Sequence, residues 1–244
     1  MRIVQYVSRI KYNQDIIFQI YDIQDRICFL KGVEFRLLAD APMEDLVEVH
    51  IHPTRHNYTY QLDDTVLKGK ILHIDGDESY LQMCEQQYKA LNVRAVCVFV
   101  KEKDMASEVI DLLTKHQPDL LVITGHDARN ENEQYSHSSD FAACIRKARE
   151  FEKDKDRLII FAGACQSDYE RLIAAGANFA SSPKRINIHA LDPVHLMIQV
   201  AVVSVKVYID IENITKNTTC KMDGIGGIDT KGVARRIYPR KEYS

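Results

Sequence analysis

The stretch RLIIFAGACQSDYERLIAAG, residues 157–176, decides the fold class. Its first seven residues are almost continuously apolar, which is typical of a strand buried on both faces of a sheet. From Gln166 onward the apolar residues recur at helical spacing, and Gly176 stands where glycines commonly end helices. We therefore predict a buried strand followed directly by a helix, with Cys165 at the junction.

The same pattern of a strand followed by a helix recurs along most of the chain. Predicted strands cover residues 69–77, 93–100, 118–125, 157–163 and 177–183, and predicted helices cover 78–91, 104–116, 138–153, 166–176 and 190–201. Apolar strands that alternate with helices indicate a parallel sheet covered by helices on both faces. We assign residues 68–201 to an α/β domain of flavodoxin-like type.

The two ends of the chain have a different character from this central part. Residues 1–67 contain short β-branched and aromatic segments with short connections, which predicts a small β-rich domain of the SH3-like barrel type. Residues 202–244 begin with the β-like stretch VVSVKVYIDI, continue through the glycine-rich GIGGIDTKG, and end in a basic segment. We expect this extension to pack on the α/β domain, with its glycines in a loop or flap.

Composition restricts the classes of function. The formal net charge is −3, which argues against a protein whose whole surface binds nucleic acid. Six dispersed cysteines form no CxxC pair, so we expect reduced thiols in the cytoplasm and no metal or other cofactor. No apolar run approaches the ~18 residues that span a bilayer, and the first residues lack the layout of a signal peptide. The sequence gives no indication of the oligomeric state.

Two reactive side chains follow two of the predicted strands. His126 follows the strand in DLLVITGHD, and Cys165 follows the strand in LIIFAGACQ. Ligands bind beyond the carboxyl ends of strands in such sheets, so the two side chains could meet there. An imidazole and a helix N-terminus would both favour the thiolate, and the N–H groups of Gly125 and Cys165 could bind an oxyanion. The alternative is that His126 is structural and that Cys165 is a small core residue.

This layout resembles the cysteine proteases that include caspases, legumains and clostripain. In those proteases one apolar block ends in His-Gly and a later block ends in Ala-Cys. Ala164-Cys165 matches the second block, whereas Gly125 precedes His126 here, which leaves the oxyanion donor open. The resemblance implies a caspase-like peptidase domain with a Cys-His dyad.

A second resemblance covers residues 15–235 and is more specific. Six segments in order resemble the YabG family of sporulation-specific proteases: RLLADAP, ILHIDGDESYL, PDLLVITGHDA, IIFAGACQS, AGANFASSPKRINIHALDPV and GIGGIDTKG. The resemblance implies a cysteine endopeptidase that processes spore coat and related spore proteins and cleaves after basic residues, notably Arg. It places His126 and Cys165 on the GHD and ACQS segments, and it implies action in the mother cell cytoplasm and the developing spore coat.

A substrate with Arg at the cleavage site needs an acidic pocket near Cys165. Asp75 and Asp77 follow the first predicted strand on the correct edge, and Asp192 is a rival. Asp77 could instead cap the following helix. Ser181 could contact the substrate backbone. Asp127 could orient His126 or could cap a turn.

The main alternative function is a non-enzymatic, receiver-like binding module. The acidic end of ILHIDGDE and Lys184 in SSPK resemble parts of a phosphoacceptor receiver domain. However, the third predicted strand ends in Thr124, where a receiver needs an Asp. The chain could therefore not work by phosphorylation of an aspartate.

Overall fold

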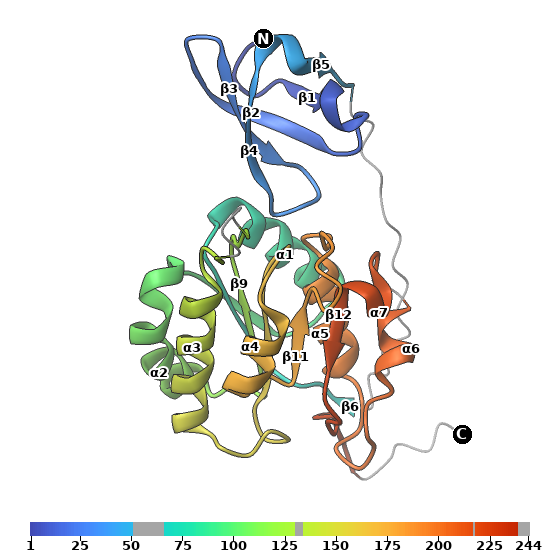
Figure 1. Ribbon diagram of the computed structural model, residues 1–244. Helices are drawn as coiled ribbons and strands as arrows, with labels where there is room; N and C mark the ends of the chain where they lie inside the picture. Colours follow the sequence, from blue (N-terminus) through green and yellow to red (C-terminus); the bar gives the residue numbers. More distant parts are fainter. Residues whose placement is uncertain (51–65, 130–133, 217, 239–244) are drawn as a thin grey trace, which may run out of the picture. The chain divides into compact units, whose positions relative to one another are not determined.

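The computed structural model of the chain describes residues 1–50, 66–129, 134–216 and 218–238. The chain divides into two compact units, residues Met1–Tyr58 and Thr59–Ser244 (Figure 1). No helix within the described ranges combines the length and the apolar character that crossing a bilayer would require.

The N-terminal unit is a five-stranded antiparallel sheet. Its strands are β1 (Tyr6–Arg9), β2 (Ile17–Gln24), β3 (Ile27–Gly32), β4 (Leu38–Pro42) and β5 (Leu46–Glu48), with 3-10 turns η1 (Ile10–Tyr12) and η2 (Met43–Asp45). The order β4-β3-β2-β1-β5 places the last strand beside the first. Alternate residues such as Phe18 and Ile20 are buried, as expected for a sheet with one apolar face. The predicted β-rich unit is confirmed, and its assignment as an SH3-like barrel stays a prediction.

The second unit is built on a six-stranded, mostly parallel sheet. Its strands are β7 (Ile71–Asp75), β8 (Ala95–Phe99), β9 (Leu120–Thr124), β10 (Ile159–Ala162), β11 (Phe179–Ser181) and β12 (Ile225–Gly227). The order is β12-β11-β10-β9-β7-β8, and only the pairing of β12 with β11 is antiparallel. The five parallel strands therefore have the 2-1-3-4-5 order of flavodoxin-like sheets, in which the order reverses between the first and third strands.

Helices cover both faces of this sheet (Figure 1). On one face, α1 (Glu78–Ala90) and α5 (Asp192–Val200) pack on strand residues such as Val122 and Phe161. On the other face, α2 (Met105–His116), α3 (Ser138–Phe151) and α4 (Tyr169–Ala175) pack on the intervening residues, such as Ile123 and Ile160. Both faces of the inner strands are thus mostly apolar, because these strands are buried on two sides, whereas the edge strand β8 is half-buried. The predicted parallel sheet with helices on both faces is confirmed.

The C-terminal extension folds differently from the prediction. The β-like stretch 202–211 forms no strand: it contributes only isolated bridges, at Ser204 and Tyr208, and leads into helix α6 (Ile211–Thr215). The glycine-rich segment is not a flap, because helix α7 (Lys221–Gly224) leads into β12 at the edge of the sheet. Farther on, β13 (Arg235–Arg236) pairs with β6 (Val66–Leu67). The edge strand of the sheet thus comes from the glycine-rich segment 224–232 and not from the valine-rich segment 202–211.

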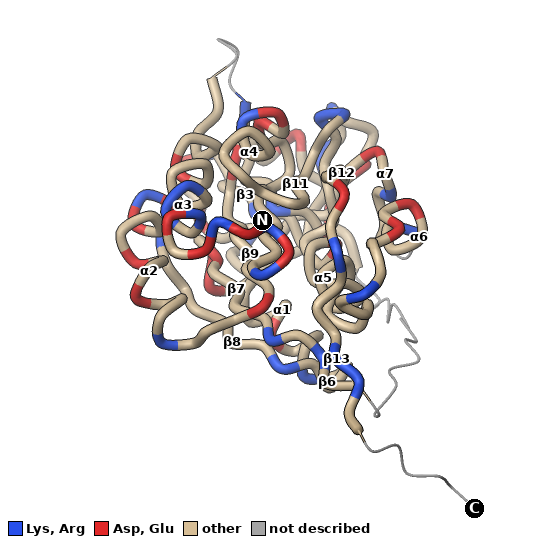
Figure 2. The backbone as a smooth tube through the Cα atoms, turned by 90° about the horizontal axis from the view of Figure 1, so that it is seen from below, with Lys and Arg blue, Asp and Glu red and all other residues tan. Residues whose placement is uncertain are grey.

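Charges of both signs are interspersed along the backbone of the second unit (Figure 2). This arrangement is in keeping with a formal net charge of −3 over 244 residues.

Candidate active site

The candidate site begins where the strand order of the sheet reverses, at the carboxyl ends of β7 and β9. His126 lies two residues beyond β9, and Asp77 lies two residues beyond β7. The Nε2 atom of His126 is 3.6 Å from Oδ2 of Asp77. The ring of Tyr80, in the first turn of α1, lies 5.8 Å from the His126 ring between centroids. Crevices at such reversal points are where open α/β sheets bind ligands.

Asp77 performs two tasks at this position. Its Oδ1 accepts hydrogen bonds from the backbone N–H groups of Ser79, at 2.9 Å, and Tyr80, at 3.1 Å, and so caps helix α1. Its Oδ2 faces His126. The helix cap that the sequence left as an alternative is therefore present, and the second oxygen remains directed at the candidate site.

Glu102 also belongs to this site, although no motif of the sequence assigns it a role. It begins the 3-10 turn η3 (Glu102–Asp104), which follows β8. Its Oε1 accepts the backbone N–H of His126 at 2.9 Å and lies 3.9 Å from His126 Nδ1. Carboxylates of two separate loops therefore face the two nitrogens of one imidazole ring. The only signal in the sequence is its position after an apolar strand.

Cys165 follows β10 and is fully buried. Its thiol donates a hydrogen bond to the backbone carbonyl of Ile188 at 3.4 Å. Gly163 has φ of +123°, and a Cβ at this position would overlap the hydroxyl of Ser181, so the turn into Cys165 requires glycine. The predicted helix immediately after Cys165 is wrong, because α4 begins only at Tyr169. A helix dipole therefore does not act directly on this thiol.

The register of the sheet brings His126 and Cys165 to the same edge. Strands β9 and β10 are neighbouring and parallel, with Ala162 paired to Ile123. His126 and Cys165 each lie three positions beyond this pair (123 + 3 = 126 and 162 + 3 = 165). The two residues that the sequence singled out therefore follow adjacent strands at the same number of positions beyond a paired register.

Asp127 connects the turn after β9 to the turn after β10. Its carboxylate accepts hydrogen bonds from the N–H of His137, at 2.8 Å, and from the hydroxyl groups of Ser138 and Ser167. Ser167 in turn accepts the N–H of Ala164 at 2.9 Å. Burial raises the pKa of Asp127 although these hydrogen bonds act in the opposite direction. The carboxylate thus braces the turn that carries Cys165.

Comparison with known proteins identifies the family. The family profile described as "YabG peptidase U57" matches residues 2–66 and 52–239. The sporulation-specific protease YabG of Bacillus subtilis (strain 168) is 37% identical over 280 residues, with coverage of 96% of this chain and 97% of the relative. The chain belongs to the YabG peptidase family. It is therefore a peptidase related to a protease of sporulation, as the order of its segments predicts.

Three further residues proposed from the sequence lie in the interior of this YabG-family chain. Asp75 accepts the hydroxyl of Thr124 at 2.8 Å, Ser181 donates to the carbonyl of Ala164 at 2.7 Å, and Asp192 accepts backbone N–H groups, including that of Thr219 at 2.7 Å. All three are fully buried, whereas the side chain of Asp77 is 13% exposed. Their contact with substrate stays a prediction. Gly125 lies against Glu102, because a Cβ there would contact Oε1 at 2.5 Å.

A buried polar network lies below the candidate site of this family member. His73 pairs through Nδ1 with the hydroxyl of Tyr88, at 3.2 Å, and through Nε2 with that of Thr124, at 2.6 Å. His73, Asp75 and Cys84 are also the one group of metal-ligand type in the described part of the chain, with ligand atoms within 4.8 Å of one another. Because hydrogen bonds already engage His73 and Asp75, we assign these residues to the scaffold of the site.

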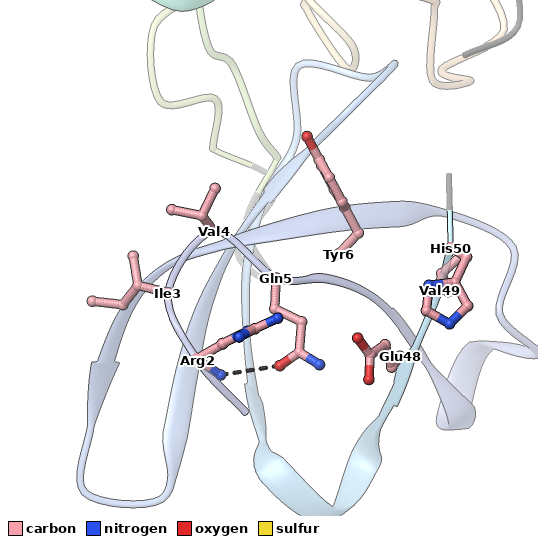
Figure 3. Close-up of a pocket in the computed structure, with 8 residues that line it drawn as sticks. All are labelled: Arg2, Ile3, Val4, Gln5, Tyr6, Glu48, Val49 and His50. Atoms are coloured by element: carbon pink, nitrogen blue, oxygen red, sulfur yellow. Dashed lines mark hydrogen bonds between the residues drawn. The ribbon is translucent and has the colours of Figure 1, made fainter. Parts of the chain in front are cut away.

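Two cavities in the described part of the chain are lined by residues other than His126 and Cys165. One of about 580 Å³ is in the N-terminal unit, lined by residues that include Ile3, Tyr6 and Glu48 (Figure 3). The other, of about 610 Å³, is lined by Asp119 and Leu158 among others, at the amino ends of β9 and β10. Neither cavity includes the candidate catalytic edge.

Proposed function

We propose that this chain is a cysteine endopeptidase in which Cys165 is the nucleophile and His126 is its acid-base partner. The observation that carries the proposal is the equivalent position of the two residues, three beyond a paired register on adjacent parallel strands. Membership of a peptidase family supports hydrolysis of peptide bonds over the receiver-like binding module.

The proposed reaction uses one proton and one nucleophile. The thiol of Cys165 gives its proton to His126, and the sulfur attacks the scissile carbonyl carbon. His126 then protonates the leaving amine as the C–N bond breaks, which leaves a thioester. Water attacks the thioester with help from His126, and the carboxylate product leaves as the thiol is restored. The N–H groups of Gly125 and Cys165 are the proposed donors to the oxyanion.

Access to the thiol requires the segment around Ile188 to move. The Cys165 thiol is fully buried and donates to the Ile188 carbonyl. A substrate carbonyl at the sulfur would have to replace this contact. We infer that the structure represents a closed state, and that substrate binding displaces the segment that carries Ile188.

The proposed substrates are spore coat and related spore proteins, cleaved after Arg in the mother cell cytoplasm and the developing spore coat. Support comes from the name of the relative, a sporulation-specific protease, and from the acidic character of the site. Asp77 is the proposed acid for the Arg side chain, because its side chain is 13% exposed whereas Asp75 and Asp192 are buried. Ser181 remains a proposed contact of the substrate, reached only when the site opens.

The proposal is tested by the cleavage of fluorogenic peptides with Arg before the scissile bond. We expect Cys165→Ala and His126→Ala each to lower kcat/KM by about a thousandfold or more, since both act in the proton transfer. Cys97→Ala is the control, because burial raises the pKa of the Cys97 thiol to about 12 and keeps it protonated. Retention of wild-type turnover by Cys165→Ala would exclude the cysteine mechanism.

A further inference from the structure

We propose that Glu102 is a positioning residue that holds His126 in place and stabilises its protonated form. This inference rests on the proposed function, because a protonated imidazole is needed there to deliver a proton to the leaving amine. It concerns a residue that follows a predicted strand and to which no motif of the sequence assigns a role.

One carboxylate oxygen of Glu102 lies close to both the backbone N–H and the ring of His126. Oε1 accepts the His126 N–H at 2.9 Å and lies 3.9 Å from Nδ1. The side chain of Glu102 is 11% exposed and that of His126 is 19% exposed. At this burial, solvent and salt screen the attraction between the two charges much less than at the surface. A carboxylate at such a distance favours the imidazolium form.

The backbone around Glu102 is shaped to receive its side chain. A Cβ on Gly76 would overlap the carboxyl group of Glu102, and a Cβ on Gly125 would lie 2.5 Å from its Oε1. Gly76 follows β7 and Gly125 follows β9, so two strand ends lack side chains where Glu102 crosses them. The carboxylate thereby reaches from the end of β8, over β7, to His126 beyond β9. This close fit fixes the position of the carboxylate.

The charged groups that face the ring come from different elements. Besides Glu102, Asp77 places Oδ2 at 3.6 Å from Nε2, and Tyr80 packs its ring at 5.8 Å. Cys165 is the proposed partner from the β10 turn, and its thiolate would favour the imidazolium further. Both carboxylates act in the same direction on the imidazole. Glu102 differs from Asp77 because it also binds the His126 backbone, whereas Asp77 caps α1.

The test is the pH dependence of kcat/KM for Glu102→Gln. The glutamine keeps an acceptor for the His126 N–H but removes the charge. We expect the alkaline limb of the profile to move to lower pH by about one unit, and kcat at pH 8 to fall about tenfold with little change in KM. Glu78→Gln is the matched control, since Glu78 is an exposed acid beside Asp77 and should leave the profile unchanged.

The outcomes separate this inference from the proposed function. An alkaline limb in Glu102→Gln that coincides with that of the wild type would overturn the positioning role, even if kcat fell. If Glu102→Gln unfolds, Glu102→Asp replaces it, because the shorter side chain keeps the charge but moves it away from the His126 ring. We then expect a smaller shift of the alkaline limb to lower pH, and the absence of any shift would refute the positioning role. An NMR titration of the His126 ring in the same variants needs no turnover, and a lower midpoint is expected. Full activity in Cys165→Ala would refute the dyad alone.

Discussion

The turns after β9 and β10 stand side by side, but their environments are opposite. His126, after β9, is partly exposed and lies between the carboxylates of Asp77 and Glu102. Cys165, after β10, is fully buried and donates to the Ile188 carbonyl. The first turn therefore places an imidazole between two carboxylates, and the second keeps a thiol covered. We infer that activation acts on the cysteine side, by uncovering the thiol.

The first prediction asks whether Asp77, which faces His126, serves the histidine or the substrate. Asparagine caps helices as well as aspartate does, so Asp77→Asn keeps the cap of α1 and loses only the charge. If Asp77 binds the Arg side chain of the substrate, we expect the preference for Arg over Ala to fall about thirtyfold, the loss of one charged hydrogen bond of about 2 kcal/mol. The measurement is kcat/KM for the two peptides.

The contrary outcome of this experiment is equally specific. If the Arg preference of Asp77→Asn stays at the wild-type value while the alkaline limb moves to lower pH, Asp77 serves His126 and not the substrate. The proposed pocket would then need another acid. Glu78→Gln is again the matched control, since it removes a charge one position away in an exposed residue.

The sequence predicts the strands of this site well and the partners of His126 poorly. β9 and β10 are almost continuously apolar, because both of their faces are buried, and β7 is buried throughout although it carries His73 and Asp75. The carboxyl ends of these strands are therefore recognisable. Glu102 follows β8, which the strand order places at the edge beyond β7. Its reach to His126 depends on that order and on the missing side chain of Gly76, and neither is visible in a linear pattern.

The same limit explains the errors in the prediction. VVSVKVYIDI has the composition of a strand, but the edge position beside β11 is taken by Ile225–Gly227. Composition describes what a segment can form, whereas the competition for a place in the sheet decides what it forms. The start of α4 differs from the prediction for a local reason: Asp168 caps this helix by accepting the N–H of Arg171, so the residues before Asp168 remain a turn.

The second prediction concerns the cover over Cys165. The side chain of Gln166 donates a hydrogen bond to that of Asn187 at 3.3 Å. This bond connects the turn that carries Cys165 to the segment around Ile188 that covers the thiol. Asn187→Ala removes this bond, worth about 1 kcal/mol, and we expect alkylation of Cys165 by iodoacetamide to accelerate about fivefold. Peptide mapping by mass spectrometry follows each cysteine separately. Cys144 gives the baseline, because burial raises the pKa of its thiol to about 12.

A matched substitution in the same segment tests whether the effect is local. The ion pair of Lys184 with Asp223 is exposed on both sides, so Lys184→Ala should leave the alkylation rate unchanged. If Asn187→Ala also leaves the rate unchanged, the Gln166–Asn187 bond does not hold the cover. If Cys165 reacts as slowly as Cys144 in every variant, it is a core residue and the two turns differ in function as well as in environment.

The smallest expected effect concerns Asp127, which ties the two turns together. Its pKa is raised by burial, so the native state binds a proton more readily than the unfolded chain does. Stability therefore falls as the pH rises from the usual aspartate range through the raised pKa, since the buried carboxyl must then be charged. Asp127→Asn lacks this titration and loses hydrogen bonds, with a cost of about 1–2 kcal/mol.

Urea unfolding of wild type and Asp127→Asn between pH 4 and pH 7 measures this difference, with the exposed Glu150→Gln as the control. We expect the stability advantage of the wild type to be larger at pH 4 than at pH 7, because the protonated carboxyl is buried at lower cost. An advantage that instead grows with pH would mean that the hydrogen bonds from His137, Ser138 and Ser167 outweigh burial. Asp127 would then stabilise the turn that carries Cys165 as a carboxylate anion.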